Sequence, residues 1–461
     1  MNNIGKDKKR FFHKLKQYIS LFGRGDIITK LSFIFLGLSN IVRGQIIKGL
    51  LYFLLELSFI GYMIFSGVKS LAGLVTLGSH QQGMAFNEKT GIYEISRGDN
   101  SMLMLLSGVV VLVLIVFFLL FWSMAVKSAY KLQLQKENKK KIPGIREEIR
   151  ALFDSNIHKS LMLIPITGLV IFTVVPLIYM ILMAFTNYDV NHQPPGKLFN
   201  WVGIANFKAL LNSASTLGHT FWPILGWTLI WAVFATFTNY FGGMLLAILI
   251  NMKGINYKKF WRTIFVITIA VPSFVTLLVI RIMLSDHGAL NILLQELGFL
   301  SGPLPFFTNA AWARVSVIII NMWIGIPHTM LITTGILMNI PADLYESAKI
   351  DGAGPLKTYT KITMPYMLFV TTPYLITNFI ANINNFNVIY FLTGGGPATL
   401  DYFKGAGKTD LLVTWLYKLT VDSKDYCYAS SIGILIFVIS ATFSLLLYTR
   451  SGAYKNEEGF Q

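Results

Sequence analysis

The stretch PADLYESAKIDGAGPLKTYTKITMP, residues 341–365, is a polar segment set between two long apolar runs. Pro341 suits a first helical turn because its missing N–H would have no partner there. Asp343 then places a carboxylate near the positive end of the helix dipole. Gly352 is positioned to end the helix, since glycine readily adopts the left-handed conformation of a helix C-terminus. We therefore expect a short helix between Pro341 and Gly352.

A second short helix is expected directly after the first. Gly354 and Pro355 predict a turn, and the helix that follows runs through Ile362. Pro365 is expected to open the next apolar run. The whole stretch is thus predicted to be a hairpin of two short helices.

One face of the first helix carries mostly small side chains. Leu344, Ser347 and Ala348 lie at positions i, i+3 and i+4, which share a helix face. Small side chains let another surface approach closely, so this stripe is a candidate docking face.

The composition around this hairpin is that of a membrane protein. Of the 461 residues, 54% are hydrophobic and only 13% are charged, more apolar than a water-soluble core requires. An α-helix needs about 20 apolar residues to cross a bilayer. We expect an all-α, polytopic membrane protein with eight transmembrane helices, near residues 47–67, 102–126, 160–186, 222–251, 260–285, 313–338, 366–388 and 429–449.

The basic residues indicate the orientation, because Lys and Arg near the ends of spans stay in the cytoplasm. Of the 39 Lys and Arg residues, 27 lie on one side of the eight-span arrangement and nine on the other. The 27 fall in segments 1–46, 127–159, 252–262, 339–365 and 450–461. Both termini and the hairpin are therefore predicted to be cytoplasmic.

The net charge of +17 is explained by anionic lipid headgroups beside the spans, so we expect a lipid bilayer partner and no nucleic acid. The single cysteine, Cys427, excludes an intramolecular disulfide and a multi-cysteine metal site. The apolar stretch from Leu31 to Val42 is interpreted as an interfacial segment and not as a removed signal. In the charged linker, a helix is expected after Pro143.

The hairpin resembles the EAA loop of permeases of binding-protein-dependent ABC importers. Glu346-Ser347-Ala348 is followed after three residues by Gly352, and after nine further residues by Ile362 and then Pro365; Ser347 and Met364 stand where the family shows alanine and leucine. The resemblance implies a type I ABC importer permease fold and a loop seated in a cleft of an ATPase subunit, held there by the glutamate. The implied coupling residues are Glu346, Ser347, Ala348, Asp351, Gly352, Ile362 and Pro365.

Two predicted spans carry polar side chains at helical spacing. Asn378, Asn382 and Asn385 lie at i, i+4 and i+7 after the hairpin. In the span before it, Asn321, Gly325 and His328 share a face beside Trp323. Carboxamides both donate and accept hydrogen bonds, which suits neutral hydroxyl-rich solutes. Hydrogen bonding between helices remains the alternative explanation of these amides.

From about Trp222 onward, the chain resembles the larger permease subunit of maltose importers, the MalF type, through FNVIYFLTGGGPAT and KTDLLVTWLYKLT. The resemblance implies a substrate pocket built from these two spans. With Trp323 beside them, the residues concerned are Asn321, Ile324, Gly325, His328, Asn378, Asn382 and Asn385. Ile269, Ala381 and His328 stand where maltose-transporting relatives tend to show aromatic rings, so malto-oligosaccharides, galacto-oligosaccharides and other glycan fragments remain open as substrates.

The resemblance also implies an assembly. The chain is expected to pair with a second permease subunit, two ATPase subunits and an extracellular solute-binding protein. It would import oligosaccharides without being an enzyme and without binding a cofactor, since ATP and magnesium would lie on the ATPases. It is expected in the plasma membrane of a bacterium. A monoderm host is suggested because the large external domain that some relatives carry after the third span is missing.

The segment GAGKT, residues 405–409, looks like part of a phosphate-binding loop, but Tyr402 stands where that pattern needs glycine. An ion-coupled secondary transporter is the alternative function. It is disfavoured because Glu56 and Arg281 are the ionisable residues well inside predicted spans, and neither belongs to an acid–histidine relay.

The expected organisation has six parts. These are a basic cytoplasmic or interfacial segment (1–46), the first two transmembrane helices (47–126), a cytoplasmic linker (127–159), the third helix with an outer loop (160–221), a permease core with the coupling loop 341–365 (222–449), and a cytoplasmic tail (450–461).

Overall fold

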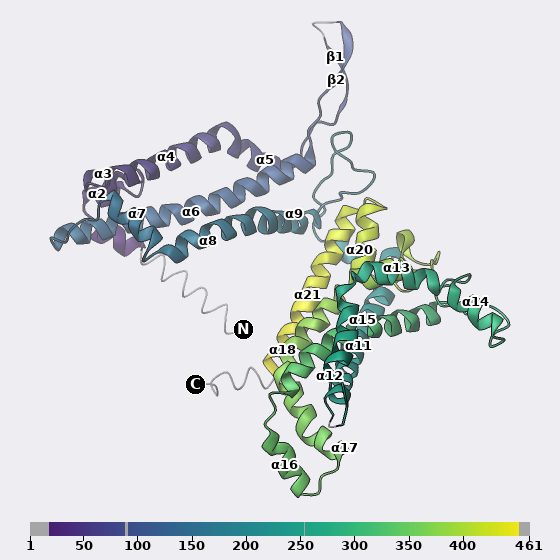
Figure 1. The fold of residues 1–461 in the computed structure, drawn as a ribbon. Helices are drawn as coiled ribbons and strands as arrows, with labels where there is room; N and C mark the ends of the chain where they lie inside the picture. The colour runs from purple at the N-terminus through teal and green to yellow at the C-terminus, as the bar shows by residue number, and fades with distance from the viewer. Residues whose placement is uncertain (1–17, 88–90, 253, 451–461) are drawn as a thin grey trace. The chain divides into compact units, whose positions relative to one another are not determined.

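The computed structural model describes residues 18–87, 91–252 and 254–450, and these residues are mostly helical (Figure 1). The chain divides into two compact units. Unit 1 comprises residues 1–182 and 191–201, and unit 2 comprises residues 183–190 and 202–461. Residues 1–17 of the expected N-terminal segment and 451–461 of the expected tail lie outside the described residues.

Unit 1 is built around one long helix, α6 (Ser101–Glu137), against which α5 packs. Its other elements are α2 (Ile27–Leu31), α3 (Leu38–Val42), α4 (Ile46–Tyr62), the π-helical turn η1 (Met63–Gly67), α5 (Val68–Thr76), β1 (Gly83–Asn87), β2 (Ile92–Ser96), α7 (Ile145–Phe153), α8 (Ile157–Leu169), the π-helical turn η2 (Val170–Val174) and α9 (Val175–Met183), whose last residue belongs to unit 2. The helix expected after Pro143 is therefore present as α7.

A two-stranded antiparallel ribbon, which we did not predict, lies between α5 and α6. Gly83 pairs with Ser96 and Asn87 with Ile92. The strands alternate in side-chain direction, and the alternation in GMAFN and IYEIS is the signal that the sequence analysis passed over. An isolated ribbon of this size is marginal as an independent domain.

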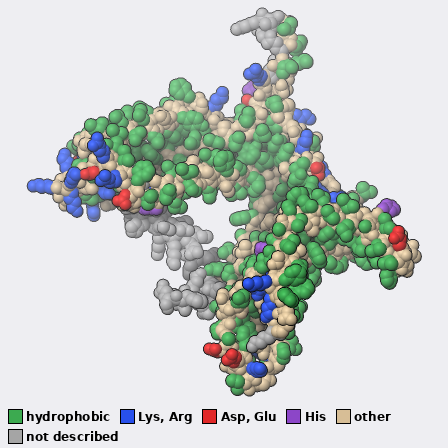
Figure 2. Space-filling model, viewed as in Figure 1, with side chains coloured by type: hydrophobic (Ala, Val, Ile, Leu, Met, Phe, Trp, Pro, Cys, Tyr) green, Lys and Arg blue, Asp and Glu red, His purple; other side chains and the backbone are tan. Residues whose placement is uncertain are grey.

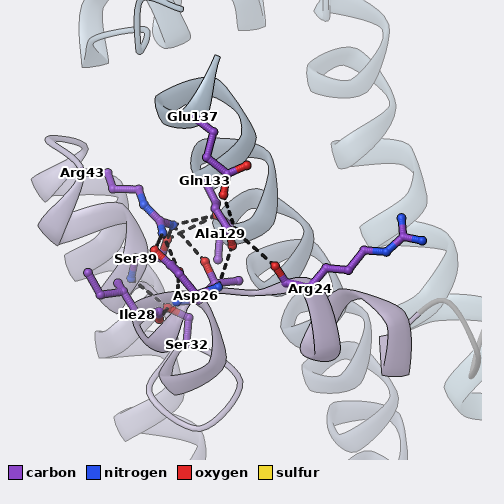
Figure 3. A network of polar contacts seen from close by, with 10 residues as sticks. Arg24, Asp26, Ile28, Ser32, Ser39, Arg43, Ala129, Gln133 and Glu137 are labelled. Carbon is purple, nitrogen blue, oxygen red and sulfur yellow. Dashed lines mark hydrogen bonds and ion pairs between the residues drawn. The ribbon is translucent and has the colours of Figure 1, made fainter. Parts of the chain in front are cut away.

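The segment interpreted as interfacial lies within a stretch, residues 24–43, that is bonded to α6 (Figure 3). Arg43 donates two hydrogen bonds to the carboxylate of Asp26, at 2.8 and 2.6 Å, and one to the carbonyl oxygen of Ala129, at 2.9 Å. The side chain of Gln133 accepts from the Asp26 N–H and donates to the carbonyl of Arg24. Polar contacts with α6, rather than an apolar face alone, therefore hold residues 24–43.

Replacing Asp26 by asparagine is expected to destabilise unit 1. Burial alone would raise the pKa of Asp26, but hydrogen bonds from Arg43 and Thr29 lower it to about 2. The Arg43 side chain is 1% exposed and Asp26 is 45% exposed, so we expect a loss of about 1–3 kcal/mol. Because the folded pKa is depressed, the contribution should be complete above the ordinary value of 3.8 and fade as the pH falls toward 2.

Thermal unfolding of the purified protein in detergent checks this expectation. Glu137→Gln is the matched control, because Glu137 accepts from Gln133 at the exposed edge of the same network. Equal unfolding temperatures for Asp26→Asn and Glu137→Gln at neutral pH would contradict the expectation.

Unit 2 is a bundle in which α11 (Thr216–Asn251) packs along α15 (Ala310–Leu337) and also against α18 (Met364–Ile383). Its other elements are α10 (Ala205–Leu211), α12 (Lys258–Ala270), α13 (Ser273–Met283), α14 (Ala289–Glu296), α16 (Ala342–Ile350), α17 (Pro355–Thr358), the π-helical turn η3 (Tyr359–Thr363), α19 (Phe386–Leu392), the 3₁₀ turn η4 (Phe403–Gly405), α20 (Leu412–Val421) and α21 (Tyr426–Arg450). Figure 1 places α16 and α17 at one end of this bundle and α20 at the other.

Among the described residues, six helices are long and apolar enough to cross a membrane: Ile46–Thr76, Ser101–Glu137, Ile157–Met183, Thr216–Asn251, Ala310–Leu337 and Tyr426–Thr449. The span expected as one helix at 260–285 is a pair, α12 and α13, bent by 88° at Val271 and Pro272, and would make a seventh. The seventh expected span, 366–388, corresponds to α18, which falls outside the apolar set. Apolar side chains cover the visible flanks of the helices (Figure 2), as expected for surfaces facing lipid.

Close contact between α11 and α15 depends on Gly243 in α11. A Cβ atom on Gly243 would lie 2.6 Å from Cβ of Thr329 and 2.8 Å from the backbone nitrogen of Met330. Gly243→Ala should therefore force the helices apart and cost about 1–3 kcal/mol. The control is Gly226→Ala in the same helix, where a Cβ would meet nothing within 4 Å. A lower thermal unfolding temperature for the first variant alone is the expected result; equal temperatures would contradict it.

The GAGKT segment is a structured loop rather than a phosphate cradle. Its Gly407 N–H donates to the buried carboxylate of Asp410 at 2.7 Å. Lys418 also donates to that carboxylate, at 2.7 Å, and Thr414 does so at 2.9 Å. The N–H group that would face a phosphate in such a motif is therefore already bonded within the protein.

Candidate functional site

A cavity of about 570 Å³ lies in unit 2 among α11, α12, α13, α15 and α18. Among the described residues, its lining contains no Asp, Glu, Lys or Arg and one histidine, His328, and it is rich in amides and hydroxyls. The lining residues are Asn239, Thr268, Ile269, Ala270, Val271, Pro272, Ser273, Thr276, Asn321, Trp323, Ile324, Gly325, His328, Thr329, Tyr374, Asn378 and Asn382.

The break between α12 and α13 forms one wall of this cavity. Pro272 has no N–H, and a residue before proline is pushed toward extended conformations, as Val271 is, with φ −80° and ψ 127°. The helix accordingly stops at Ala270 and restarts at Ser273. Within a bilayer, non-helical backbone is tolerated where it is buried in protein or lines a wet cavity. The break therefore fits a solute site.

Seven of the eight residues predicted to contact substrate line this one cavity. They are Asn321, Trp323, Ile324, Gly325, His328, Asn378 and Asn382. The structure thus brings together side chains that lie on separate helices, α15 and α18.

Asn385 is the exception, and the expectation that it shares a helix face with Asn378 and Asn382 is wrong. Helix α18 ends at Ile383, and Asn385 is the N-cap of α19. Its side-chain oxygen accepts from the Val388 N–H at 3.2 Å. A capping asparagine after a helix end leaves the helical periodicity on which the prediction depended.

The two asparagines on α18, Asn378 and Asn382, differ in burial and in the hydrogen bonds that they make to other residues of the protein. Asn382 donates to the hydroxyl of Thr236 at 3.0 Å and is buried. Its backbone oxygen accepts from the indole of Trp231 at 3.2 Å. Hydrogen bonding between helices therefore explains most of the contacts of Asn382, as the alternative explanation proposed. Asn378 is only half-buried.

The cavity also contains polar residues that the sequence analysis did not name: Asn239, Thr268, Ser273, Thr276, Thr329 and Tyr374. For Asn239 a signal was available, because its amide lies in the middle of the apolar run of residues 222–251. The hydroxyl residues gave no signal, because Ser and Thr in membrane helices commonly bond their own backbone.

The hairpin begins with α16, which ends as predicted at Gly352. Gly352 has φ +71°, the left-handed conformation. The Ala353 N–H donates to the Ala348 carbonyl at 2.8 Å, and the Gly352 N–H to the Lys349 carbonyl at 3.1 Å. This pair of bonds is the Schellman arrangement that satisfies the last carbonyls of a helix.

The second arm of the hairpin differs from the prediction. It is not a separate short helix, because α17 continues through η3 directly into α18. In the π-helical turn η3 the Met364 N–H donates to the Tyr359 carbonyl, five residues back. Pro365, which has no N–H to donate, is thereby taken into the first turn of α18 without breaking the helix.

Tyrosines fasten the hairpin to the bundle. The hydroxyl of Tyr345 on α16 lies 3.1 Å from the hydroxyl of Thr363 on the second arm. Tyr345 and Tyr359 pack against a buried cluster that includes Met244 and Met367. Burial raises the pKa of Tyr359. Motion of the hairpin would therefore be transmitted to α11 and α18.

The predicted coupling residues are divided between the surface and the interior. Glu346, Ser347, Asp351, Gly352 and Pro365 are exposed, Ile362 is half-buried and Ala348 is buried. The predicted docking stripe is thus wrong for Ala348, which faces the interior. Two large apolar side chains that we did not predict, Ile350 and Leu356, are 86% and 76% exposed near the turn. Such apolar exposure at a polar tip is typical of a protein contact.

Comparison with known proteins identifies the family. Residues 239–452 match the family model of the binding-protein-dependent transport system inner membrane component. The chain is 34% identical to the galactooligosaccharides transport system permease protein GanP of Bacillus subtilis (strain 168), over 91% of this chain and 96% of the relative. It is 33% identical to the maltodextrin transport system permease protein MalC of Streptococcus pneumoniae, over 92% and 95%.

Solved structures agree at the level of the fold. The chain is similar to a chain in the crystal structure of a bacterial alginate ABC transporter in complex with an alginate pentasaccharide-bound periplasmic protein, with a TM-score of 0.54 and 22% identity over 66% of this chain and 98% of that chain. With an identity this low, the similarity concerns the fold alone. The relatives match over nearly the whole chain, and the apolar helices and the fold agree with them. This multi-pass membrane protein therefore belongs to the permeases of binding-protein-dependent ABC importers, which are inner-membrane components of sugar transport systems.

Proposed function

We propose that this chain is one of two permease subunits in an ATP-driven importer that moves neutral oligosaccharides by alternating access. The observation that carries the proposal is the cavity of unit 2, where amides and hydroxyls face one space beside a broken helix. Amides and hydroxyls suit uncharged hydroxyl-rich solutes. The lining offers no Arg or Lys for an acidic polysaccharide among the described residues. Membership of the importer family sets aside the ion-coupled alternative.

The substrate class is further supported by the relatives. One is named for galactooligosaccharides and another for maltodextrin, and the chain spans 96% and 95% of their lengths. We propose an oligosaccharide of either kind, recognised through Asn321, Trp323, Ile324, Gly325, His328, Asn378 and Asn382, with Asn385 capping the start of α19.

The hairpin supplies the link to ATP hydrolysis. We propose that each permease subunit engages one ATPase through such a hairpin, so that two ATPases carrying ATP and magnesium drive the pair. In this arrangement Glu346 and Asp351 contact the ATPase directly, whereas Ala348 and Ile362 hold the hairpin in shape. An extracellular binding protein delivers the sugar at the other end of unit 2. Both termini are cytoplasmic, and α18 completes eight spans in the plasma membrane of a monoderm bacterium.

The two exposed apolar residues of the hairpin provide a test of docking. Ile350→Ser and Leu356→Ser together are expected to reduce co-purification of the ATPase by about tenfold or more, because apolar anchors at the centre of an interface carry much of its binding energy. The control is Leu400→Ser, a fully exposed leucine in the loop before α20. Unchanged ATPase recovery with the double variant would contradict this use of the hairpin tip.

The function itself is tested in proteoliposomes that contain the chain with its partner subunits, its binding protein and enclosed ATP. Uptake of maltotriose or galactotriose should require ATP hydrolysis and should be unaffected by a protonophore. Uptake that a protonophore abolishes, or that proceeds without ATP, would overturn the proposal.

A further inference from the structure

Two amides in the wall of the cavity each keep a buried atom without a hydrogen-bond partner among the described residues. On α11 the atom is the side-chain oxygen of Asn239, and on α15 it is the side-chain nitrogen of Asn321. The two residues are only 6% and 5% exposed. Buried polar groups are nearly always bonded, and leaving one unbonded is costly. Both residues line the cavity, and two unpaired polar atoms in its lining residues point to a ligand.

The two atoms are complementary in hydrogen-bonding character. The side-chain oxygen of Asn239 accepts hydrogen bonds, and the side-chain nitrogen of Asn321 donates them. A sugar hydroxyl does both at once, because it donates through its O–H and accepts through its oxygen lone pairs. We propose that Asn239 and Asn321 together recognise one hydroxyl group of the transported oligosaccharide, with Asn239 as a specificity-determining residue. This inference rests on the proposed function.

Gly325 explains how Asn239 reaches this position. A Cβ atom at residue 325 would lie 2.1 Å from the side-chain nitrogen of Asn239 and 2.4 Å from its Cγ. The amide of Asn239 therefore rests in the space that a side chain at 325 would fill. The resemblance implied that Gly325 contacts the sugar, whereas the structure assigns it a second role, that of admitting the amide of α11 to the wall.

A comparison within the cavity separates this pair from a purely structural amide. Asn382 is equally buried, but its nitrogen donates to Thr236, and its oxygen lies 3.4 Å from the nitrogen of Asn385. Its hydrogen bonds join helices. The unpaired atoms of Asn239 and Asn321 hold no helices together, so a structural role leaves them unexplained.

The experiment measures uptake by the complete transporter in proteoliposomes. Maltotriose and β-1,4-galactotriose are compared with their monodeoxy derivatives, each of which lacks one hydroxyl. For wild type, one deoxy derivative should be taken up with a kcat/KM at least about tenfold below its parent, because a site built to bond a hydroxyl rejects an analogue that lacks it. For Asn239→Ala, uptake of the parent should fall by a similar factor while uptake of that derivative stays unchanged.

A second pair of variants separates recognition from folding. Gly325→Ala alone should displace the amide and reproduce the loss of discrimination with a lower thermal unfolding temperature. Asn239→Ala combined with Gly325→Ala removes the clash, so it should recover the unfolding temperature but not the discrimination.

Three results would overturn the inference. They are equal losses for parent and derivatives in Asn239→Ala, discrimination that persists in that variant, and discrimination that returns in the double variant. In each of them wild type still imports the sugar, so the proposed function stands. If the assembled wild-type transporter imports neither sugar, the proposed function fails and the inference fails with it.

Discussion

Replacing Glu346 by lysine is expected to reduce sugar uptake to background while leaving membrane insertion intact. Glu346 is exposed on α16, at the end of unit 2 opposite α20, and no hydrogen bond or ion pair to another described residue involves it. The bundle should therefore fold without its carboxylate. In the proposed complex that carboxylate is enclosed by the ATPase. Placing an unmatched cation there should cost about 2–5 kcal/mol, or roughly 30-fold to several thousand-fold in affinity.

The measurement is ATP-dependent uptake together with recovery of the ATPase on purification. Glu296→Lys at the end of α14 is the matched control, because it makes the same charge reversal at another exposed glutamate of unit 2. Retained uptake in Glu346→Lys vesicles would contradict the proposal that Glu346 couples the permease to the ATPase. Loss of the protein from the membrane would show that Glu346 serves folding instead.

Replacing Asn378 by leucine is expected to give the second large effect, a fall in uptake of about 10- to 100-fold. Asn378 lines the cavity from α18, is half-buried, and makes no side-chain hydrogen bond to the described residues. Leucine has a similar size and favours the helix. The main loss is then a bond to the sugar, together with the cost of leaving its hydroxyl unsatisfied, about 1–3 kcal/mol.

Asn384→Leu is the matched control for Asn378→Leu. Asn384 caps the same helix, is exposed, and bonds the Ile380 carbonyl at 3.1 Å outside the cavity lining. Basal ATP hydrolysis by the assembled transporter should be unchanged in both variants, which separates a defect in the cavity from one in coupling. If Asn384→Leu impairs uptake as strongly as Asn378→Leu, the effect belongs to the helix end and not to the cavity.

The hairpin shows how far local signals reach. The start of α16 after Pro341 and its end at Gly352 follow from backbone chemistry within one turn, and both agree with the prediction. The second arm does not, since a separate short helix was expected before the next span. Pro365 opens α18 as expected, but α17 continues into α18 through the π-helical turn η3. Local rules describe which residues favour a boundary, but neighbouring packing decides whether the helix actually stops.

The cavity shows the same limit for long-range contacts. The spacing on α15 was sufficient to bring Asn321, Gly325 and His328 into one lining. Asn385 does not line the cavity, because α18 ends two residues before it. Asn239 was missed because its part in the wall depends on Gly325, 86 positions along the chain.

The sequence by itself determined that this is a helical membrane protein of the importer permease family with a polar hairpin between its late spans. Composition, periodicity and short motifs carry that information residue by residue. Only the tertiary structure decided the bend at Val271 and Pro272, the burial of Ala348 and the pairing of Asn239 with Gly325. The physical reason is that burial and unsatisfied hydrogen bonds are properties of contacts between distant segments, and a single segment does not contain them.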